Sequence, residues 1–464
     1  MFKIRGMRGF LASSIGVTCA VALALPPTPT AAAATAAPAE GGATAAARTD
    51  LPGSTQSLPL SPLRTDRTLG PTADQGVTRR EVDRYAMVGV VWDDPDTELH
   101  GRVQVRTRSA GTGAWSGWQD VETHNDAADP DSAERATGRV RGATAPLWVG
   151  ESDAVEARVR AEEADRTEET ARGTRTVRTA VPLPHGLRLE LIDPGEAPAD
   201  QTSRAAGAPE SAESAEVTEA AVANADLAPT TVTEIPALDR AATERELVTL
   251  RGADLTDAQR AKPHIGPRPA IVTRRGWGAD EKLRERKFVY TSTVKAAFVH
   301  HSATGNGYSC GQSASVIRGI YRYHVKSLHW RDIGYNFLVD KCGKIYEGRA
   351  GGVGKAVLGA HTLGFNTNST GIAVLGSFGS AKPPTAAVTA VARLSAWKLG
   401  LYGANPRGTT YLKSGGGNLY RKGKNVRLNV ISGHRDGFAT DCPGGQLYSR
   451  LGTIRTTAAR DQGR

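Results

Sequence analysis

Apolar and polar residues alternate with a period of two in much of the first half of the chain, between residues 82 and 194. This period places every second side chain on one face of an extended strand, so it indicates strands that bury one face. Turn-forming residues separate the segments, as in antiparallel sheets. We therefore expect an antiparallel β-rich domain at 82–194, with the charged stretch 162–175 as a loop. The alternation is clearest in AMVGVVW (86–92), GRVQVRTR (101–108), AWSGWQDV (114–121), AVEARVRA (154–161) and LRLELI (187–192).

A different pattern begins near residue 266. Short apolar runs that are typical of buried strands alternate with longer segments in which apolar residues recur at helical spacing. Strands separated by helices predict a mixed central β-sheet flanked by helices, an α/β fold, at 266–464. The predicted strands are 295–301, 370–376 and 426–431, with a hairpin that joins 335–340 to 344–347, and the predicted helices are 313–325, 385–402 and 446–459.

Two segments follow neither pattern. Residues 37–81 are rich in Ala, Thr, Pro and Gly, and residues 195–265 are rich in Ala and Glu and contain no Phe, Trp or Tyr. Such compositions bury too little apolar surface to offset the entropy of ordering the chain. We expect a low-complexity tether at 37–81 and an acidic disordered linker at 195–265, in which short helices, for instance around 240–250, are compatible with the sequence.

The amino terminus has the features of a secretory signal peptide at 1–36. Three basic side chains among the first eight residues precede an apolar run at 10–25, and Ala-rich cleavage sites follow. The run is shorter than the roughly 20 residues of a transmembrane helix, so we expect no membrane span. The protein is then secreted, either extracellular or associated with the cell wall. Export excludes nucleic acid as the expected partner.

The charge is distributed unevenly along the chain. The formal net charge is +10, yet 30 basic and only 9 acidic side chains lie between Gly266 and Arg464. A basic domain attracts polyanions. In an exported protein this favours anionic wall polymers as partners, although such a charge is also usual on a solvated basic face.

Four of the seven tryptophans lie in the predicted β-rich domain. Exposed indole rings stack on sugars, whereas buried ones fill the core of a domain that has few other large side chains. Both interpretations stay open. The four are Trp92, Trp115, Trp118 and Trp148.

Two histidines and one cysteine form the chemical constellation of the second domain. His300 ends a predicted buried strand, and His434 and Cys442 lie in GHRDGFATDCPG. Three protein ligands with one open position are typical of catalytic zinc sites, and thiolate with imidazole favours Zn²⁺ over Mg²⁺ or Ca²⁺. The spacing alone also fits one core histidine, one surface histidine and an inert cysteine.

The remaining cysteines suggest a disulfide. Removal of the signal peptide leaves three cysteines, and a Cys310–Cys342 bridge would keep Cys442 as a ligand. Such a bridge would contribute about 3–4 kcal/mol in the chain-entropy treatment. Pairings that include Cys442 are the alternative.

Residues 271–451 resemble the family of peptidoglycan recognition proteins and type-2 N-acetylmuramoyl-L-alanine amidases. The resemblance implies a mixed β-sheet with helices and a zinc cleft on one face. It does not cover the β-rich domain or the linker. The matching blocks, in the family's order, are RRGWGAD (274–280), FVHHSAT (298–304), DIGYNFLVD (332–340), IYEGR (345–349), GAHTLGFN (359–366), STGIAVLG (369–376) and GHRDGFATDCPG (433–444).

The resemblance also implies roles for single residues. His300, His434 and Cys442 match the zinc ligands, Tyr335 matches the catalytic tyrosine, and Thr440 matches a lysine or threonine of active relatives. Members that only bind the wall have typically lost the cysteine ligand, so the resemblance favours an enzyme.

The loop block that lines the cleft in the family contains His361 and Asn366, which we expect to contact substrate. Two positions depart from the family pattern. Phe365 stands where relatives often have tyrosine, and the segment 350–357 differs from animal members, whose rules for stem-peptide choice therefore do not transfer.

The reaction that the resemblance implies is hydrolysis of the amide between the lactyl group of N-acetylmuramic acid and L-alanine in peptidoglycan. Zn²⁺ lowers the pKa of a bound water to about 7, so that water attacks the carbonyl at neutral pH. Tyr335 and Thr440 would stabilise the oxyanion, and Tyr335 or a water would protonate the leaving amine.

Two alternatives belong to other classes: a non-catalytic peptidoglycan-binding protein, and a cysteine peptidase in which His434 or His300 activates Cys442. Four further residues of the second domain are expected to be structural. His301 points to the strand face opposite His300, and the others are His324, Glu347 and Arg349.

Overall fold

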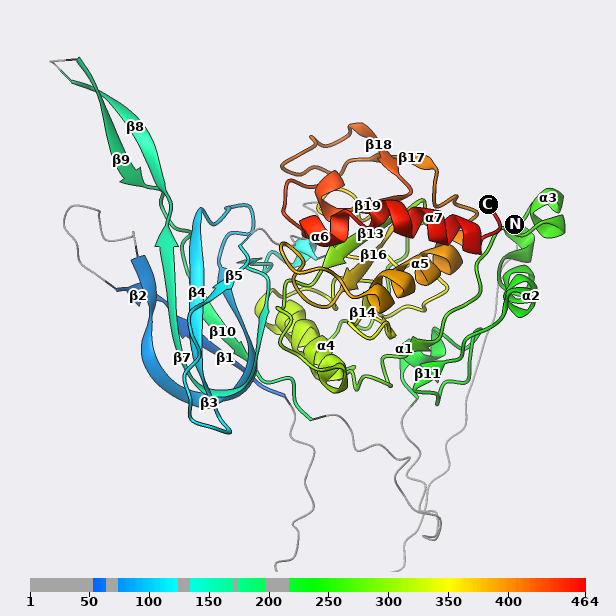
Figure 1. Ribbon diagram of the computed structural model, residues 1–464, viewed down its shortest axis with the longest axis horizontal. Coiled ribbons are helices and arrows are strands. Elements are labelled where there is room, and N and C mark those ends of the chain that lie inside the picture. Colours follow the sequence, from blue (N-terminus) through cyan, green and yellow to red (C-terminus); the bar gives the residue numbers. More distant parts are fainter. Residues whose placement is uncertain (1–52, 64–73, 124–133, 171–172, 197–216) are drawn as a thin grey trace, which may run out of the picture. The chain divides into compact units, whose positions relative to one another are not determined.

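The first sheet is antiparallel throughout and contains eight strands within the described residues. This computed structural model describes residues 53–63, 74–123, 134–170, 173–196 and 217–464. The strand order of the first sheet is β1-β10-β3-β7-β4-β5, and β2 and β6 also pair with β3. The expected antiparallel β domain is therefore confirmed, as Figure 1 shows. The strands are β1 (Thr55–Pro59), β2 (Ser61–Pro62), β3 (Asp74–Trp92), β4 (Gly101–Ser109), β5 (Gln119–Val121), β6 (Gly142–Ala143), β7 (Leu147–Ala161) and β10 (Arg188–Ile192).

Two parts of this domain differ from expectation. Strands β1 and β2 lie inside the segment expected to be a tether. This segment forms a strand because β1 pairs with β10 along its whole length. The charged stretch expected to be a loop forms a two-stranded ribbon of β8 (Glu163–Thr170) and β9 (Gly173–Ala180). Asp165 and Arg178 of this ribbon are both exposed and lie 3.3 Å apart across it.

The tryptophans of the β-rich domain are engaged within the protein. Trp92 and Trp148 are buried. The guanidinium groups of Arg79 and Arg106 lie 5.0 and 5.8 Å from the ring centre of Trp115. Trp118 likewise has two arginines over its ring, at 4.0 and 4.9 Å. These contacts favour the packing role over an open sugar-stacking platform.

The second sheet is mixed and contains seven strands within the described residues, in the order β11-β12-β15-β14-β16-β13-β19. Its centre is parallel: β13 pairs with β16 on one side and with β19 on the other. The β14–β15 pair forms the expected hairpin. The strands are β11 (Glu234–Ile235), β12 (Ile271–Val272), β13 (Ala296–His301), β14 (Phe337–Val339), β15 (Ile345–Glu347), β16 (Ser369–Val374) and β19 (Ile431–Gly433).

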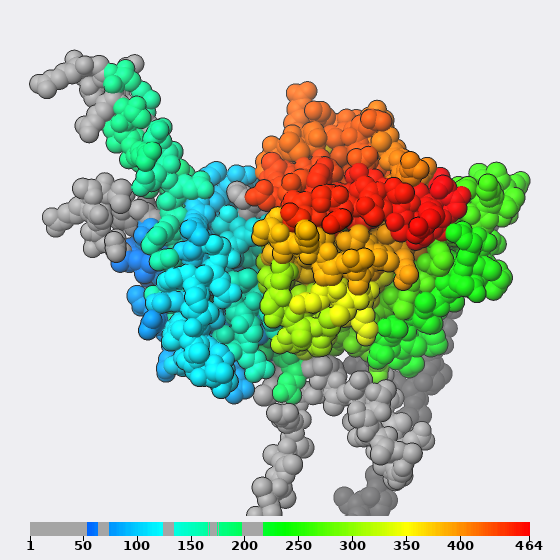
Figure 2. Space-filling view, in the orientation of Figure 1, coloured from blue at the N-terminus to red at the C-terminus, as the bar shows by residue number. Residues whose placement is uncertain are grey.

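Helices cover both faces of this sheet, so the expected α/β class is confirmed. Helices α5 (Thr385–Gly400) and α7 (Leu451–Asp461) pack on one face, where Val299 and Val374 meet Trp397 and Ile454. In Figure 2 the red α7 lies along the orange α5 at the surface. Helix α4 (Ser313–Arg322) packs on the opposite face. Because both faces of β13 are buried, its apolar run is continuous rather than alternating.

The carboxy-terminal elements are more divided than expected. The predicted strand 426–431 is split between β18 (Asn425–Asn429), which pairs with β17 (Thr409–Lys413) in a separate ribbon, and β19. The predicted helix 446–459 is divided into α6 (Gly445–Tyr448) and α7.

The segment expected to be a solvated linker folds in its described part. Strand β11 pairs with β12, and Leu247 of α2 (Arg240–Arg251) is buried in the core of the second domain. Two short helices, α1 (Glu219–Val222) and α3 (Asp257–Ala261), flank α2. The composition of this segment did not indicate that it folds. Its apolar residues are single rather than in runs, and they contact a core that other segments supply.

Candidate metal centre

Two neighbouring parallel strands position the two histidines. In the β13–β19 pair Val299 lies opposite Gly433. The next residue on each side is a candidate ligand: His300 within β13, and His434 directly after β19. Since the strands run in the same direction, both side chains leave the sheet at the same end. The ring centres of the two imidazoles are 4.5 Å apart.

A turn after His434 brings Cys442 to the same place. The carbonyl of Cys442 accepts a hydrogen bond from Arg435 N at 3.1 Å, which folds the loop back on itself. Thr440 Oγ1 accepts from Cys442 N at 3.2 Å. As a result, Cys442 Sγ lies 3.8 Å from His300 Nδ1. Ligand atoms of His300, His434 and Cys442 all lie within 4.8 Å of one another.

The environment of these three side chains suits a metal ion. All three are buried. Burial, together with the neighbouring His434 ring, holds the pKa of His300 well below its usual value. Burial also lowers the pKa of His434 to about 3. Both imidazoles are thus neutral at physiological pH, which leaves nitrogen lone pairs for coordination. The set therefore fits Zn²⁺, which binds imidazole and thiolate.

His361 contacts Nε2 of His300, the ring nitrogen that does not face Cys442. Its Nδ1 lies 3.3 Å from His300 Nε2 and 3.0 Å from Thr362 Oγ1. If His300 coordinates through the Nδ1 that faces Cys442, its Nε2 carries the proton and donates to His361. Such hydrogen bonds fix the tautomer and orientation of metal-bound histidines. The structure thus favours a positioning role for His361 over the expected substrate contact.

Asn366 holds the loop that carries His361. Its Oδ1 accepts from His361 N at 2.7 Å and from Thr362 N at 3.0 Å. The side chain is buried. Because its amide oxygen already serves two backbone N–H groups, the structure favours loop support over the substrate contact expected for Asn366.

Tyr335 lies beside the metal centre, two residues before β14. Its ring centre is 5.5 Å from that of His300 and 5.8 Å from that of His324. His324 is buried, and its Nδ1 accepts from Gly334 N at 3.0 Å, so it fixes the backbone that precedes Tyr335. This agrees with the structural role expected for His324.

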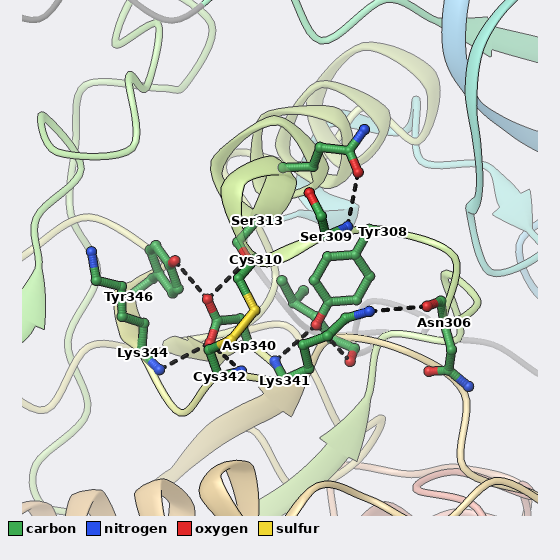
Figure 3. The surroundings of a disulfide bond; sticks show 12 residues. Asn306, Tyr308, Ser309, Cys310, Ser313, Asp340, Lys341, Cys342, Lys344 and Tyr346 are labelled. Carbon is green, nitrogen blue, oxygen red and sulfur yellow. Dashed lines mark hydrogen bonds between the residues drawn. A yellow bond between two sulfur atoms is a disulfide. The ribbon is translucent and has the colours of Figure 1, made fainter.

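The predicted disulfide is present between Cys310 and Cys342, with Cα atoms 6.2 Å apart, and Cys442 lies outside it. The bridge ties the segment before α4 to the β14–β15 turn (Figure 3). Asp340 organises this turn. Its carboxylate accepts from Cys342 N, Lys344 N, Ser313 Oγ and Tyr346 OH, all at 2.9 Å.

Glu347 and Arg349 belong to a buried network, as expected. Glu347 accepts from Asn224 Nδ2 at 2.9 Å and from Arg274 N at 3.2 Å. Burial raises the pKa of Glu347 to about 7. Arg349 Nε donates to Ile333 O at 2.8 Å.

Three residues that contact residues singled out from the sequence were not themselves predicted. Phe438 stacks on His434, with ring centres 5.7 Å apart and an angle of 22° between the planes. It lies in the GHRDGFATDCPG block midway between His434 and Cys442, and an aromatic residue between two candidate ligands was a usable signal. Glu122 contacts His301, and Glu134 contacts Arg349. No sequence signal could reveal these two contacts, because both glutamates belong to the other sheet's domain.

Two known protein families match separate parts of the chain. A family described as Rv3811 N-terminal galactose-binding domain-like matches residues 28–179. A family described as N-acetylmuramoyl-L-alanine amidase matches residues 290–445.

Individual relatives match the second domain. Peptidoglycan-recognition protein SC2 of Drosophila simulans is 31% identical over 186 residues, which cover 39% of this chain and 85% of the relative. Human N-acetylmuramoyl-L-alanine amidase is 32% identical over 187 residues, or 40% of this chain and 28% of the relative. The solved structure of Drosophila PGRP-LB covers 39% of this chain and 92% of its own, at 25% identity and a TM-score of 0.32. Because the chain covers 85% of a relative that is 31% identical to it, the chain belongs to the family of peptidoglycan recognition proteins and N-acetylmuramoyl-L-alanine amidases.

Proposed function

We propose that the protein is a secreted, zinc-dependent N-acetylmuramoyl-L-alanine amidase that cleaves the lactyl–L-alanine amide of peptidoglycan. One observation carries the proposal: ligand atoms of two neutral imidazoles and one thiol lie within 4.8 Å of one another in a buried site. His300, His434 and Cys442 would hold the ion. A bound Zn²⁺ supplies an activated water and a Lewis acid for amide hydrolysis.

The remaining chemistry belongs to the chain's own side chains. The Tyr335 hydroxyl would donate a hydrogen bond to the carbonyl oxygen of the scissile amide, where negative charge develops. Thr440 would also stabilise the charge on this oxygen. Its Oγ1 accepts a hydrogen bond from Cys442 N. Hydrolysis adds water across the C–N bond, so the lactyl carbonyl becomes a carboxylate and L-alanine leaves as an amine, protonated by Tyr335 or by a water.

Secretion rests on the basic, apolar and Ala-rich order of residues 1–36, which lie outside the described residues. No helix in the described part of the chain is long and apolar enough to cross a bilayer. Anionic wall polymers are a further proposed partner, supported by the basic composition of residues 266–464.

The test is mass analysis of the products from a defined muropeptide. We expect release of the intact stem peptide and of a free lactyl carboxylate, loss of the reaction with a chelator, and its recovery with zinc. Binding without cleavage would favour the non-catalytic receptor. Cleavage that persists in the chelator would favour a cysteine peptidase, for which the 3.8 Å Cys442–His300 contact is also suitable.

A further inference from the structure

The β-rich domain packs on the same face of the second sheet as the candidate metal centre. The described residues between 53 and 464 belong to one compact unit. One apolar cluster contains Met87 and Trp148 from the first sheet together with Ile320 of α4 and Tyr335. The two domains therefore share part of a core on the face that carries Tyr335.

Hydrogen bonds reinforce this contact close to the metal centre. Trp148 N donates to Thr304 O at 3.0 Å, only four residues beyond His300. The buried Tyr323 hydroxyl donates to Thr144 O at 3.0 Å. The first bond holds β7 against the loop that follows β13, and the second holds the segment before β7 against the turn that follows α4.

Two glutamates of the β-rich domain contact basic groups of the second domain. Glu122 Oε1 lies 2.9 Å from His301 Nε2. Glu134 Oε1 lies 2.6 Å from an Arg349 guanidinium nitrogen, and these side chains are only 2% and 7% exposed. Removing one partner of such a buried pair leaves the other charge unpaired and is strongly destabilising to the contact.

A cavity of about 390 Å³ lies between the domains. Trp92, Leu99 and Ala143 line it from one side, and Gly416 and Phe438 from the other. Phe438 stacks on His434, so the cavity ends one aromatic ring from the metal centre. This volume lies within the usual range of pockets that hold one small ligand.

We propose that the β-rich domain holds the metal centre in a closed, autoinhibited state, and that it must move away before a peptidoglycan strand reaches His300, His434 and Cys442. This deepens the proposed function and rests on it for the identity of the substrate. The three candidate ligands and Tyr335 are each at most 5% exposed. The scissile amide of polymeric wall is flanked by glycan and peptide, so it requires a wider opening. Interface contacts lower the fraction of open molecules and weaken the apparent affinity for the polymer by that fraction.

The test compares Glu122→Ala/Glu134→Ala with Asp120→Asn. All are made in the full chain with Cys19, the cysteine of the predicted signal peptide, replaced by Ser, so that it cannot react in place of Cys442. Asp120 belongs to the same domain but pairs with Arg102 at an exposed position, where the side chains are 59% and 64% exposed. The first readout is the rate at which iodoacetamide alkylates the Cys442 thiol in metal-free protein. We expect the double variant to react more than about tenfold faster, and Asp120→Asn to react like the parent. Equal rates in all three proteins would overturn the closed state.

Measurement across a range of urea separates domain opening from unfolding. Opening exposes only the interface between the domains, so its rate depends less on urea than the rate of global unfolding, which exposes both cores as well. An alkylation rate that is fast but has the urea dependence of global unfolding counts against the proposal. If the double variant does not fold, Tyr323→Phe with Ser327→Ala removes interface hydrogen bonds to Thr144 O and Glu190 Oε2 without changing charge.

The second readout is cleavage of polymeric wall relative to a soluble muropeptide. We expect this ratio to rise in the double variant. Faster alkylation without any cleavage would refute the amidase and leave the closed state standing. Cleavage with unchanged alkylation would refute the closed state and leave the amidase standing.

Discussion

His300 Nδ1 lies 3.8 Å from Cys442 Sγ although 142 positions separate the two residues in the sequence. Strand pairing between β13 and β19, followed by the turn after His434, produces this proximity. The turn is therefore as important to the centre as the ligands themselves, because it returns the thiol to the ends of the strands.

Removal of a ligand should abolish both metal binding and hydrolysis. We expect Cys442→Ala and His300→Ala to lose stoichiometric zinc and to lower muropeptide cleavage by more than about 100-fold, beyond the usual effect of altering a supporting residue. Zinc content by mass spectrometry and product release are the measurements. Ala439→Ser, at an exposed position nearby, is the control. Full activity in either ligand variant would rule out the metal mechanism.

His361→Ala should weaken zinc binding without removing a ligand. Loss of the partner of His300 Nε2 lets the imidazole rotate and change tautomer, so we expect about 10–100-fold lower affinity. Competition with a chromogenic chelator measures this. His264→Ala, far from the centre beside Gln462, is a matched control. Unchanged affinity would return His361 to the substrate-contact hypothesis.

Tyr335→Phe should retain zinc and lose rate. The phenyl ring keeps the packing against His300 and His324, whereas the hydroxyl that we assign to the oxyanion is gone. Loss of one such donor typically lowers kcat by about 100–1,000-fold. Steady-state kinetics with matched zinc content is the measurement, and Tyr308→Phe, at the disulfide, is the control. An unchanged kcat would contradict the assigned role.

Removal of the disulfide should lower stability by about 3–4 kcal/mol, since the bridge closes a loop of 32 residues in the unfolded chain. We expect Cys310→Ser/Cys342→Ser to show a lower urea midpoint with zinc binding retained. The bridge is attached to α4 and the hairpin rather than to the ligands. Loss of zinc in a protein that remains folded would show that the bridge also positions the centre.

The buried Glu347 should make stability depend on pH. Burial raises its pKa to about 7 from an ordinary value of 4.5. Between these pH values the folded chain keeps a proton that the unfolded chain releases, so stability falls as pH rises through the window. Glu347→Gln does not titrate. Its free energy of unfolding relative to the parent should therefore increase by about 3 kcal/mol from pH 4.5 to 7.

Urea unfolding at the two pH values checks this, with the exposed Glu285→Gln as the control for loss of a carboxylate. A difference between Glu347→Gln and the parent that is the same at both pH values would contradict the shift.

The sequence predicted what periodicity and local motifs determine. The apolar run before His300, the hairpin around Cys342 and the α5 helix were recognisable because their patterns are local. Contacts between distant segments were not. The pairing of β1 with β10, the burial of Leu247 and the Glu134–Arg349 pair depend on surfaces supplied by other parts of the chain. Residue roles inside the site show the same limit, since the partner of His361 lies 61 positions away.

The shared apolar cluster has a consequence for any shortened form of the protein. A fragment that begins at Gly266 would lack β11, α2 and the first sheet, so it would present Ile320, Tyr323 and the edge of β12 to water. Bare apolar surface beside an uncapped strand promotes association between copies. The smallest well-behaved catalytic piece is therefore expected to be larger than the segment shared with relatives, and poor solubility of the short fragment would say nothing against its chemistry.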